Sequence, residues 1–140
     1  MKRRILLVDD DLAVRLTLKA VLEYHGFEVE TASSTVEALS RLESGVYQMV
    51  ISDLRMETED AGLEVIRAAQ RQNYDPAVAL LTAYPPDGEH WVDQQADSLL
   101  VKPLGTSDLV RQVEALLVRQ EDAKQRRRNR FAQGMERKAS

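Results

Sequence analysis

Short apolar runs of strand length alternate along this chain with stretches in which apolar residues recur at helical spacing. This alternation restricts the fold more than any other feature of the sequence. The first run, residues 5–8, is uninterrupted, as in a strand that is buried on both faces of a parallel sheet. The other predicted strands are FEVETA at 27–32, YQMVIS at 47–52, AVALLT at 77–82 and SLLV at 98–101.

Each predicted strand is followed by a predicted helix. Val14, Leu18 and Leu22 lie on the apolar face of the first helix, and Gly26 ends it. A weak fourth helix is expected at about Glu89–Gln95. The apolar positions of the other helices are Ala38, Leu39 and Leu42 in the second, Leu63, Ile66 and Ala69 in the third, and Leu109, Val113, Leu116 and Leu117 in a long fifth.

Five strand–helix repeats predict an α/β fold with a mostly parallel sheet and helices on both of its faces. The connections between the strands must be right-handed crossovers. Five repeats are too few for an eight-stranded barrel of ~250 residues, so we expect an open, doubly wound sheet in one domain. In such sheets ligands bind at the carboxyl ends of the strands, near the point where the strand order reverses.

Composition and charge exclude several classes of protein. The chain has no cysteine, which excludes a disulfide framework and a thiolate metal site and fits a cytoplasmic location. No segment approaches the ~20 apolar residues of a membrane span, so we expect no membrane contact. The net charge of −4 combines an acidic body with a basic tail, because residues 119–140 hold eight basic and three acidic side chains.

Charged and polar side chains gather where the predicted strands end. Because the carboxyl ends of parallel strands meet at one edge of a sheet, these side chains should lie close together. Adjacent carboxylates repel one another, so a cluster of them at this edge indicates a cation site. The residues are Asp9, Asp10 and Asp11 after the first strand, Asp53 after the third, Thr82 at the end of the fourth and Lys102 after the fifth.

The residue types at this edge suit magnesium and phosphate chemistry. Carboxylate oxygens without thiolates or a histidine cluster favour Mg²⁺ over zinc, which makes Asp9, Asp10 and Asp53 the candidate ligands. Lys102 adds a compact positive charge, and Thr82 adds a hydroxyl donor. Such parts fit phosphoryl transfer in which one carboxylate is the nucleophile.

Asp11 has a different expected role. Aspartate is strongly preferred immediately before the first turn of a helix, so we expect Asp11 to cap the first helix.

Four motifs taken together resemble the receiver domain of two-component response regulators. They are ILLVDDD at 5–11, VISDLRM at 50–56, LLTAY at 80–84 and LVKPL at 100–104, and the resemblance covers roughly residues 3–119. It implies a flavodoxin-like (βα)5 fold with strand order 2-1-3-4-5. It also implies a cytoplasmic signalling switch that changes its surface when phosphorylated.

The resemblance implies a role for each residue of the metal site. Asp53 would be the phosphoacceptor and a ligand of the Mg²⁺ cofactor. Asp10 would bind the ion directly, Asp9 would act mainly through a bound water, and the backbone carbonyl of Arg55 would complete the protein ligands.

The same resemblance implies how the phosphoryl group is held and where it comes from. Thr82 would hydrogen-bond the phosphoryl group and Lys102 would form an ion pair with it. The donor would be a sensor histidine kinase or a histidine phosphotransfer protein, and a homodimer is possible. The output partner or output domain stays unknown from the sequence.

Two features depart from the family pattern. Glu57 stands where the family usually has proline, and Gly62 follows Asp53 by nine residues instead of eight. The loop RMETEDAG at 55–62 is therefore longer and more acidic than usual, and we expect it to alter metal affinity. Leu99 replaces the aromatic residue that normally moves with the threonine, which leaves open how phosphorylation is read.

The C-terminal segment suggests a boundary at residue 120. We expect a receiver domain at 1–120 and a basic helix extension, tail or linker at 121–140. A charge block such as Arg126–Arg130 is usually solvated, so nucleic-acid binding within this chain is not expected. The alternatives are a phosphorylation-independent docking module, or the N-terminal fragment of a longer DNA-binding response regulator.

Aspartate-nucleophile phosphatases are the competing enzyme class. They need a second aspartate two residues after the nucleophile as general acid, and Arg55 occupies that position. We therefore predict that the chain is not an enzyme, beyond catalysing its own phosphorylation and dephosphorylation.

Overall fold

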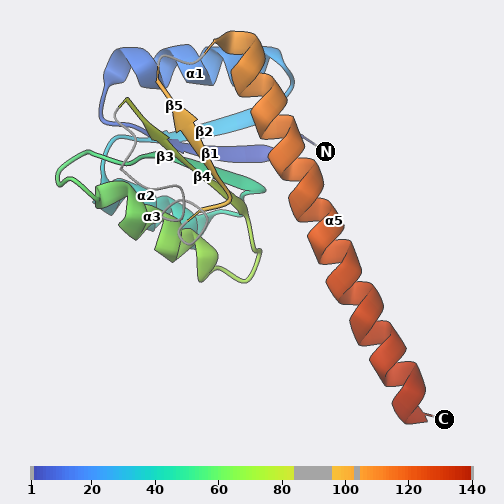
Figure 1. Ribbon diagram of the computed structural model, residues 1–140. Helices are drawn as coiled ribbons and strands as arrows, with labels where there is room; N and C mark the ends of the chain where they lie inside the picture. Colours follow the sequence, from blue (N-terminus) through green and yellow to red (C-terminus); the bar gives the residue numbers. More distant parts are fainter. Residues whose placement is uncertain (1, 84–95, 103–104, 140) are drawn as a thin grey trace.

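Five parallel strands form one sheet, and helices cover both of its faces (Figure 1). The computed structural model describes residues 2–83, 96–102 and 105–139, with side chains through residue 134. The strand order β2-β1-β3-β4-β5 confirms the predicted doubly wound, flavodoxin-like fold. The strands are β1 (Arg4–Val8), β2 (Glu28–Ala32), β3 (Met49–Asp53), β4 (Ala77–Thr82) and β5 (Ser98–Val101).

The described helices form two layers, one on each face of the sheet. One layer holds α1 (Leu12–Tyr24) and α5 (Thr106–Ala139), and the other holds α2 (Thr35–Ser44) and α3 (Ala61–Gln70) (Figure 1). The predicted weak helix at about Glu89–Gln95 lies outside the described residues.

The first strand shows why its apolar run has no polar interruption. Ile5 and Leu7 belong to the core cluster beneath α1 and α5, whereas Leu6 and Val8 belong to the cluster beneath α2 and α3. All four side chains are fully buried. A strand with helices on both faces needs apolar residues at every position, because successive side chains point to opposite faces.

Asp11 begins α1 as predicted. Its backbone is extended, and its carboxylate accepts a hydrogen bond from the backbone N–H of Val14 at 3.2 Å. Gly26 follows the end of the same helix with φ +93°, a conformation that glycine adopts without the steric penalty of a Cβ atom. Both ends of α1 are therefore fixed by local chemistry.

The helix α5 continues well beyond the sheet. Its first half packs Leu109, Val113 and Leu116 into the core, and its second half extends away from the body of the molecule (Figure 1). We call residues 121–139 the arm. The described part of the tail is thus helical and continuous with the last helix of the body.

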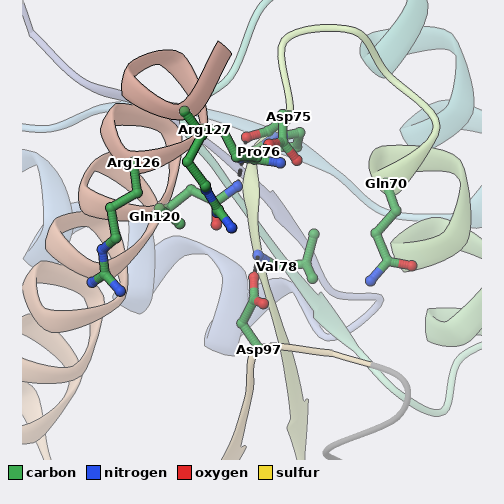
Figure 2. Close-up of a pocket in the computed structure, with 10 residues that line it drawn as sticks. Gln70, Asp75, Pro76, Val78, Asp97, Gln120, Arg126 and Arg127 are labelled. Carbon is green, nitrogen blue, oxygen red and sulfur yellow. Dashed lines mark hydrogen bonds and ion pairs between the residues drawn. The ribbon is translucent and has the colours of Figure 1, made fainter. Parts of the chain in front are cut away.

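The base of the arm is attached to the segment between α3 and β4. The side-chain amide of Gln120 donates to the carbonyl of Asp75 at 2.9 Å, and the ammonium of Lys124 donates to the carbonyl of Tyr74 at 3.2 Å. Arg127 forms an ion pair with the Asp75 carboxylate. Figure 2 shows the pocket that borders this contact, with Gln120 and Arg127 on the helix and Asp75 opposite.

Among the residues that the structure describes, none of the helices combines the length and the apolar character that crossing a bilayer requires.

Gly62 fits where no larger residue can. It lies in the first turn of α3, its N–H donates to the Leu54 carbonyl at 2.8 Å, and a Cβ atom there would lie 2.1 Å from the Asp53 carbonyl oxygen. We predict that Gly62→Ala lowers the free energy of unfolding by about 3 kcal/mol, because backbone atoms must shift to relieve the overlap. Urea unfolding measures this change.

Gly134 provides the matched control, because a Cβ atom added there meets nothing within 4 Å. Gly134→Ala should leave stability unchanged or raise it by up to about 1 kcal/mol, the usual gain in an exposed helix. Equal effects of the two substitutions would contradict the close packing of α3 on the end of β3.

Candidate functional site

Four neighbouring strands bring the predicted residues to one edge of the sheet. Asp9 follows β1, Asp53 ends β3, Thr82 ends β4 and Lys102 follows β5. These strands are consecutive in the sheet order, and β3 pairs with β4 so that Asp53 lies opposite Leu81. Residues far apart in the sequence therefore converge at the carboxyl edge.

Three carboxylates form a compact cluster at this edge. Asp9, Asp10 and Asp53 each offer an oxygen within 4.8 Å of the other two. Asp9 is fully buried and Asp53 is 7% exposed, whereas Asp10 is exposed. The cluster thus opens to solvent on the side of Asp10.

The two oxygens of Asp9 have different surroundings. Oδ1 accepts a hydrogen bond from the backbone N–H of Asp11 at 3.0 Å. Oδ2 accepts no hydrogen bond of good geometry, although the Lys102 ammonium lies 3.0 Å away as its ion-pair partner. Removing a charged carboxylate oxygen from water is costly, and one ion pair of poor hydrogen-bond geometry does not offset this cost in full. Oδ2 is therefore available to a further cation.

Lys102 links the two buried acids. Its Nζ lies 3.0 Å from Asp9 Oδ2 and 3.5 Å from Asp53 Oδ2, and its backbone N–H donates to the Thr82 carbonyl at 2.8 Å. Burial alone lowers the pKa of Lys102, but the close contact with the Asp9 carboxylate and the charges of both acids outweigh it and raise that pKa. The lysine therefore stays protonated.

Asp53 is the acid whose charge is hardest to accommodate. Burial, followed by the charge of Asp9, raises the pKa of Asp53 to about 6, although Lys102 opposes this shift and Asp10 adds to it. When all three carboxylates are ionised, one ammonium leaves the cluster with an excess of negative charge. A bound divalent cation removes that excess and favours the ionised, nucleophilic form of Asp53.

Thr82 and Arg55 follow the same two strands, β4 and β3, to the carboxyl edge of the sheet. Thr82 is 2% exposed at the end of β4, and Arg55 is half-buried in the loop two residues after Asp53. Leu99, which replaces the usual aromatic, lies on β5 opposite Leu80 and packs against the core beneath α2 and α3.

Two contacts of the site had no signal in the sequence. The guanidinium of Arg15 donates to the Asp9 backbone carbonyl at 2.7 Å, which ties the first turns of α1 to the end of β1. The Glu57 carboxylate accepts two hydrogen bonds from Thr35, at 2.8 and 2.9 Å. In the sequence Glu57 stands out only as a departure from the family pattern, because its partner lies 22 residues away.

One protein-family model matches most of the chain. The family model of the response regulator receiver domain covers residues 5–114 of the chain. The chain belongs to the response regulator receiver domain family. It is therefore a receiver of two-component signal transduction, and the resemblance based on the four motifs is confirmed.

Curated relatives of this receiver include response regulators from mycobacteria. The response regulator MprA of Mycobacterium bovis (strain BCG / Pasteur 1173P2) is 38% identical over 136 residues, which are 94% of this chain and 59% of that protein. MprA of Mycobacterium tuberculosis (strain H37Rv) gives the same identity and coverage. The chain thus spans 59% of the length of these relatives.

Solved receiver structures share the fold. A CheY-like receiver domain protein from Methanospirillum hungatei superposes with a TM-score of 0.80 at 26% identity, covering 88% of this chain and 99% of that chain. TrrA from Thermotoga maritima, solved in complex with Mg²⁺-BeF, has a TM-score of 0.69 at 35% identity, covering 81% and 98% of the two chains.

The raised pKa of Asp53 leads to a stability prediction. A carboxyl group whose pKa is raised from 3.8 to about 6 destabilises the folded state above pH 6, and this penalty is lost progressively as the pH falls from 6 to 3.8. We predict that Asp53→Asn raises the free energy of unfolding at pH 8 without divalent ions by about 1–3 kcal/mol. The difference in stability between the variant and the wild type should shrink at pH 5, because Asp53 is then mostly protonated. It should also shrink on adding Mg²⁺, because Mg²⁺ stabilises the wild type more than the variant.

Chemical denaturation at the two pH values, with EDTA or with MgCl₂, measures these differences. A variant that is less stable than the wild type in EDTA at pH 8 would contradict the electrostatic account of the cluster.

Proposed function

We propose that this receiver accepts a phosphoryl group from a phosphohistidine donor onto Asp53 and thereby switches its surface. The observation that supports this most is the position of Lys102, which contacts both Asp9 and Asp53 at the head of the acidic cluster. A nucleophilic carboxylate, a cation beside it and a nearby hydroxyl are the groups that phosphoryl transfer needs.

The proposed metal is Mg²⁺, held by Asp9, Asp10, Asp53 and the backbone carbonyl of Arg55. The donor set supports this choice, because the cluster offers hard oxygen ligands and the sequence has no cysteine. When bound, the ion neutralises the carboxylates and the charge on the phosphoryl oxygens.

In the proposed step, a carboxylate oxygen of Asp53 attacks phosphorus as the nucleophile. The new O–P bond forms while the N–P bond of the phosphohistidine breaks, and the imidazole nitrogen keeps the electron pair of that bond. Lys102 forms an ion pair with the phosphoryl group, and the Thr82 hydroxyl donates a hydrogen bond to it. The product is an acyl phosphate on Asp53.

Asp9 and Arg15 would act without touching the phosphoryl group. The buried Asp9 carboxylate holds Lys102 at 3.0 Å, and Arg15 binds the Asp9 carbonyl at 2.7 Å. These contacts orient the lysine before the donor arrives, so little rearrangement is needed during the reaction.

The partners follow from the receiver family and are part of this proposal. The donor would be a sensor histidine kinase or a histidine phosphotransfer protein, in the cytoplasm, and the response would pass to an output partner or output domain. A homodimer is possible. We propose no turnover of a metabolite, since Arg55 stands where an aspartyl phosphatase has its general acid.

The division into a receiver at 1–120 and an extension at 121–140 is also a proposal. The family match ends at residue 114, and the arm contacts the body mainly through polar groups at its base. The alternative is that the chain is the N-terminal part of a longer DNA-binding response regulator, and the 59% coverage of the curated relatives is compatible with it.

Intact-mass spectrometry tests the proposed chemistry. With Mg²⁺ and acetyl phosphate, the wild type should gain a single phosphoryl adduct that EDTA abolishes. Asp53→Asn should gain none, because its amide is not a nucleophile.

Asp11→Asn is the matched control. Asparagine caps a helix as well as aspartate does, and Asp11 is not part of the acidic cluster. This variant should be labelled like the wild type. Labelling of Asp53→Asn to the wild-type extent, or a wild type that is never labelled, would contradict the proposed function.

A further inference from the structure

One carboxylate ties the loop between β3 and α3 to the N-terminus of α2. Glu57 Oε1 accepts a hydrogen bond from the Thr35 backbone N–H at 2.8 Å, and Oε2 accepts one from the Thr35 hydroxyl at 2.9 Å. Thr35 is the first residue of α2 and is 8% exposed. Because both oxygens bind the same nearly buried residue, the direction of the Glu57 side chain is fixed.

The helix end that Glu57 binds belongs to the surroundings of the acidic cluster. The Asp9 backbone N–H donates to the carbonyl of Ala32, the last residue of β2, at 3.1 Å. Only Ser33 and Ser34 separate Ala32 from α2. Glu57 therefore holds the loop after β3 against the loop after β2, next to the end of β1 where Asp9 and Asp10 begin.

The backbone of this loop is held at its two ends, and in its middle the Met56 N–H donates to the Thr58 carbonyl at 3.1 Å. The Leu54 N–H donates to the Leu81 carbonyl at 2.9 Å, and the Gly62 N–H donates to the Leu54 carbonyl at 2.8 Å. Glu57 lies between these fixed ends, two residues after Arg55. Its contact with Thr35 restricts the middle of a loop that is one residue longer than the family usually has.

The charge of Glu57 is directed to the helix and not to the metal cluster. Among the described residues, the cluster consists of Asp9, Asp10 and Asp53. A carboxylate at a helix N-terminus also interacts favourably with the helix dipole.

We propose that Glu57 is a positioning residue of the Mg²⁺ site, which by binding Thr35 holds the segment 55–57, and with it the backbone carbonyl of Arg55, beside the acidic cluster. The inference rests on the proposed function, because it assigns Glu57 to the site at which Asp53 reacts. It also says how the altered loop changes metal affinity: Glu57 raises the affinity for Mg²⁺ by ordering the Arg55 carbonyl.

Titration of the folded protein with MgCl₂ by isothermal calorimetry tests this inference. Glu57→Ala should weaken Mg²⁺ binding by about 10-fold, the usual size of effect when a group that orients a metal ligand is lost. Thr35→Val removes only the hydroxyl and should weaken binding less. The double variant should be no weaker than Glu57→Ala, because the two residues act through one contact.

Ser34→Ala is the control for a purely structural role. Ser34 caps the same helix end by accepting a hydrogen bond from the Glu37 N–H at 3.2 Å, whereas both hydrogen bonds of the Glu57 contact come from Thr35. Ser34→Ala and Glu57→Ala should both lower the melting temperature, but only Glu57→Ala should change the Kd for Mg²⁺. If the Kd of Glu57→Ala for Mg²⁺ stays within twofold of the wild-type value, as expected for Ser34→Ala, the inference is wrong.

The rate of labelling by acetyl phosphate separates this inference from the function on which it rests. For Glu57→Ala the rate should fall at low Mg²⁺ and recover at saturating Mg²⁺, since Asp53, Thr82 and Lys102 are intact. A wild type that binds Mg²⁺ and is labelled, alongside a Glu57→Ala variant with an unchanged Kd, would overturn the inference alone. A wild type that neither binds nor is labelled would overturn both.

Discussion

The fully buried carboxylate of Asp9 sets the requirement that the rest of the site must meet. A charge without access to water is costly unless it is paired, and Lys102 is the ammonium that reaches Asp9 Oδ2, at 3.0 Å. This pairing is possible because the order β1-β3-β4-β5 brings the end of β5 to the same edge as the end of β1. The same lysine also contacts Asp53, so the proposed nucleophile and its cation lie together in the structure without a donor.

The sheet could be predicted from the sequence because its packing is repetitive. Every residue of β1 from Ile5 to Val8 is buried, so the strand is an uninterrupted apolar run, and Asp11 caps α1 through a contact only three residues away. The strand order came from the resemblance to receivers, since apolar periodicity does not say which strands are neighbours. Once that order is known, the convergence of Asp9, Asp53 and Lys102 follows.

Polar contacts between loops could not be predicted in this way. Glu57 and Thr35 are 22 residues apart, and neither apolar periodicity nor a local motif relates them. The contacts of the arm also have no signal in the sequence. The apolar period fades after Leu117 although the helix continues. Polar groups such as Lys124 attach the arm to the body, and such contacts leave no apolar pattern.

The arm and the acidic cluster lie at opposite ends of β4. The arm's base contacts Asp75, just before the strand begins, and Thr82 ends the strand at the cluster.

The proposed phosphoryl transfer converts the carboxylate of Asp53 into an acyl phosphate. Borohydride reduces an acyl phosphate to an alcohol, so reduction of the labelled chain followed by peptide mass mapping identifies the modified residue. We expect homoserine at position 53 and unmodified aspartate at positions 9, 10 and 11. Homoserine at one of those three positions, or a phosphoryl group that survives on another residue, would contradict it.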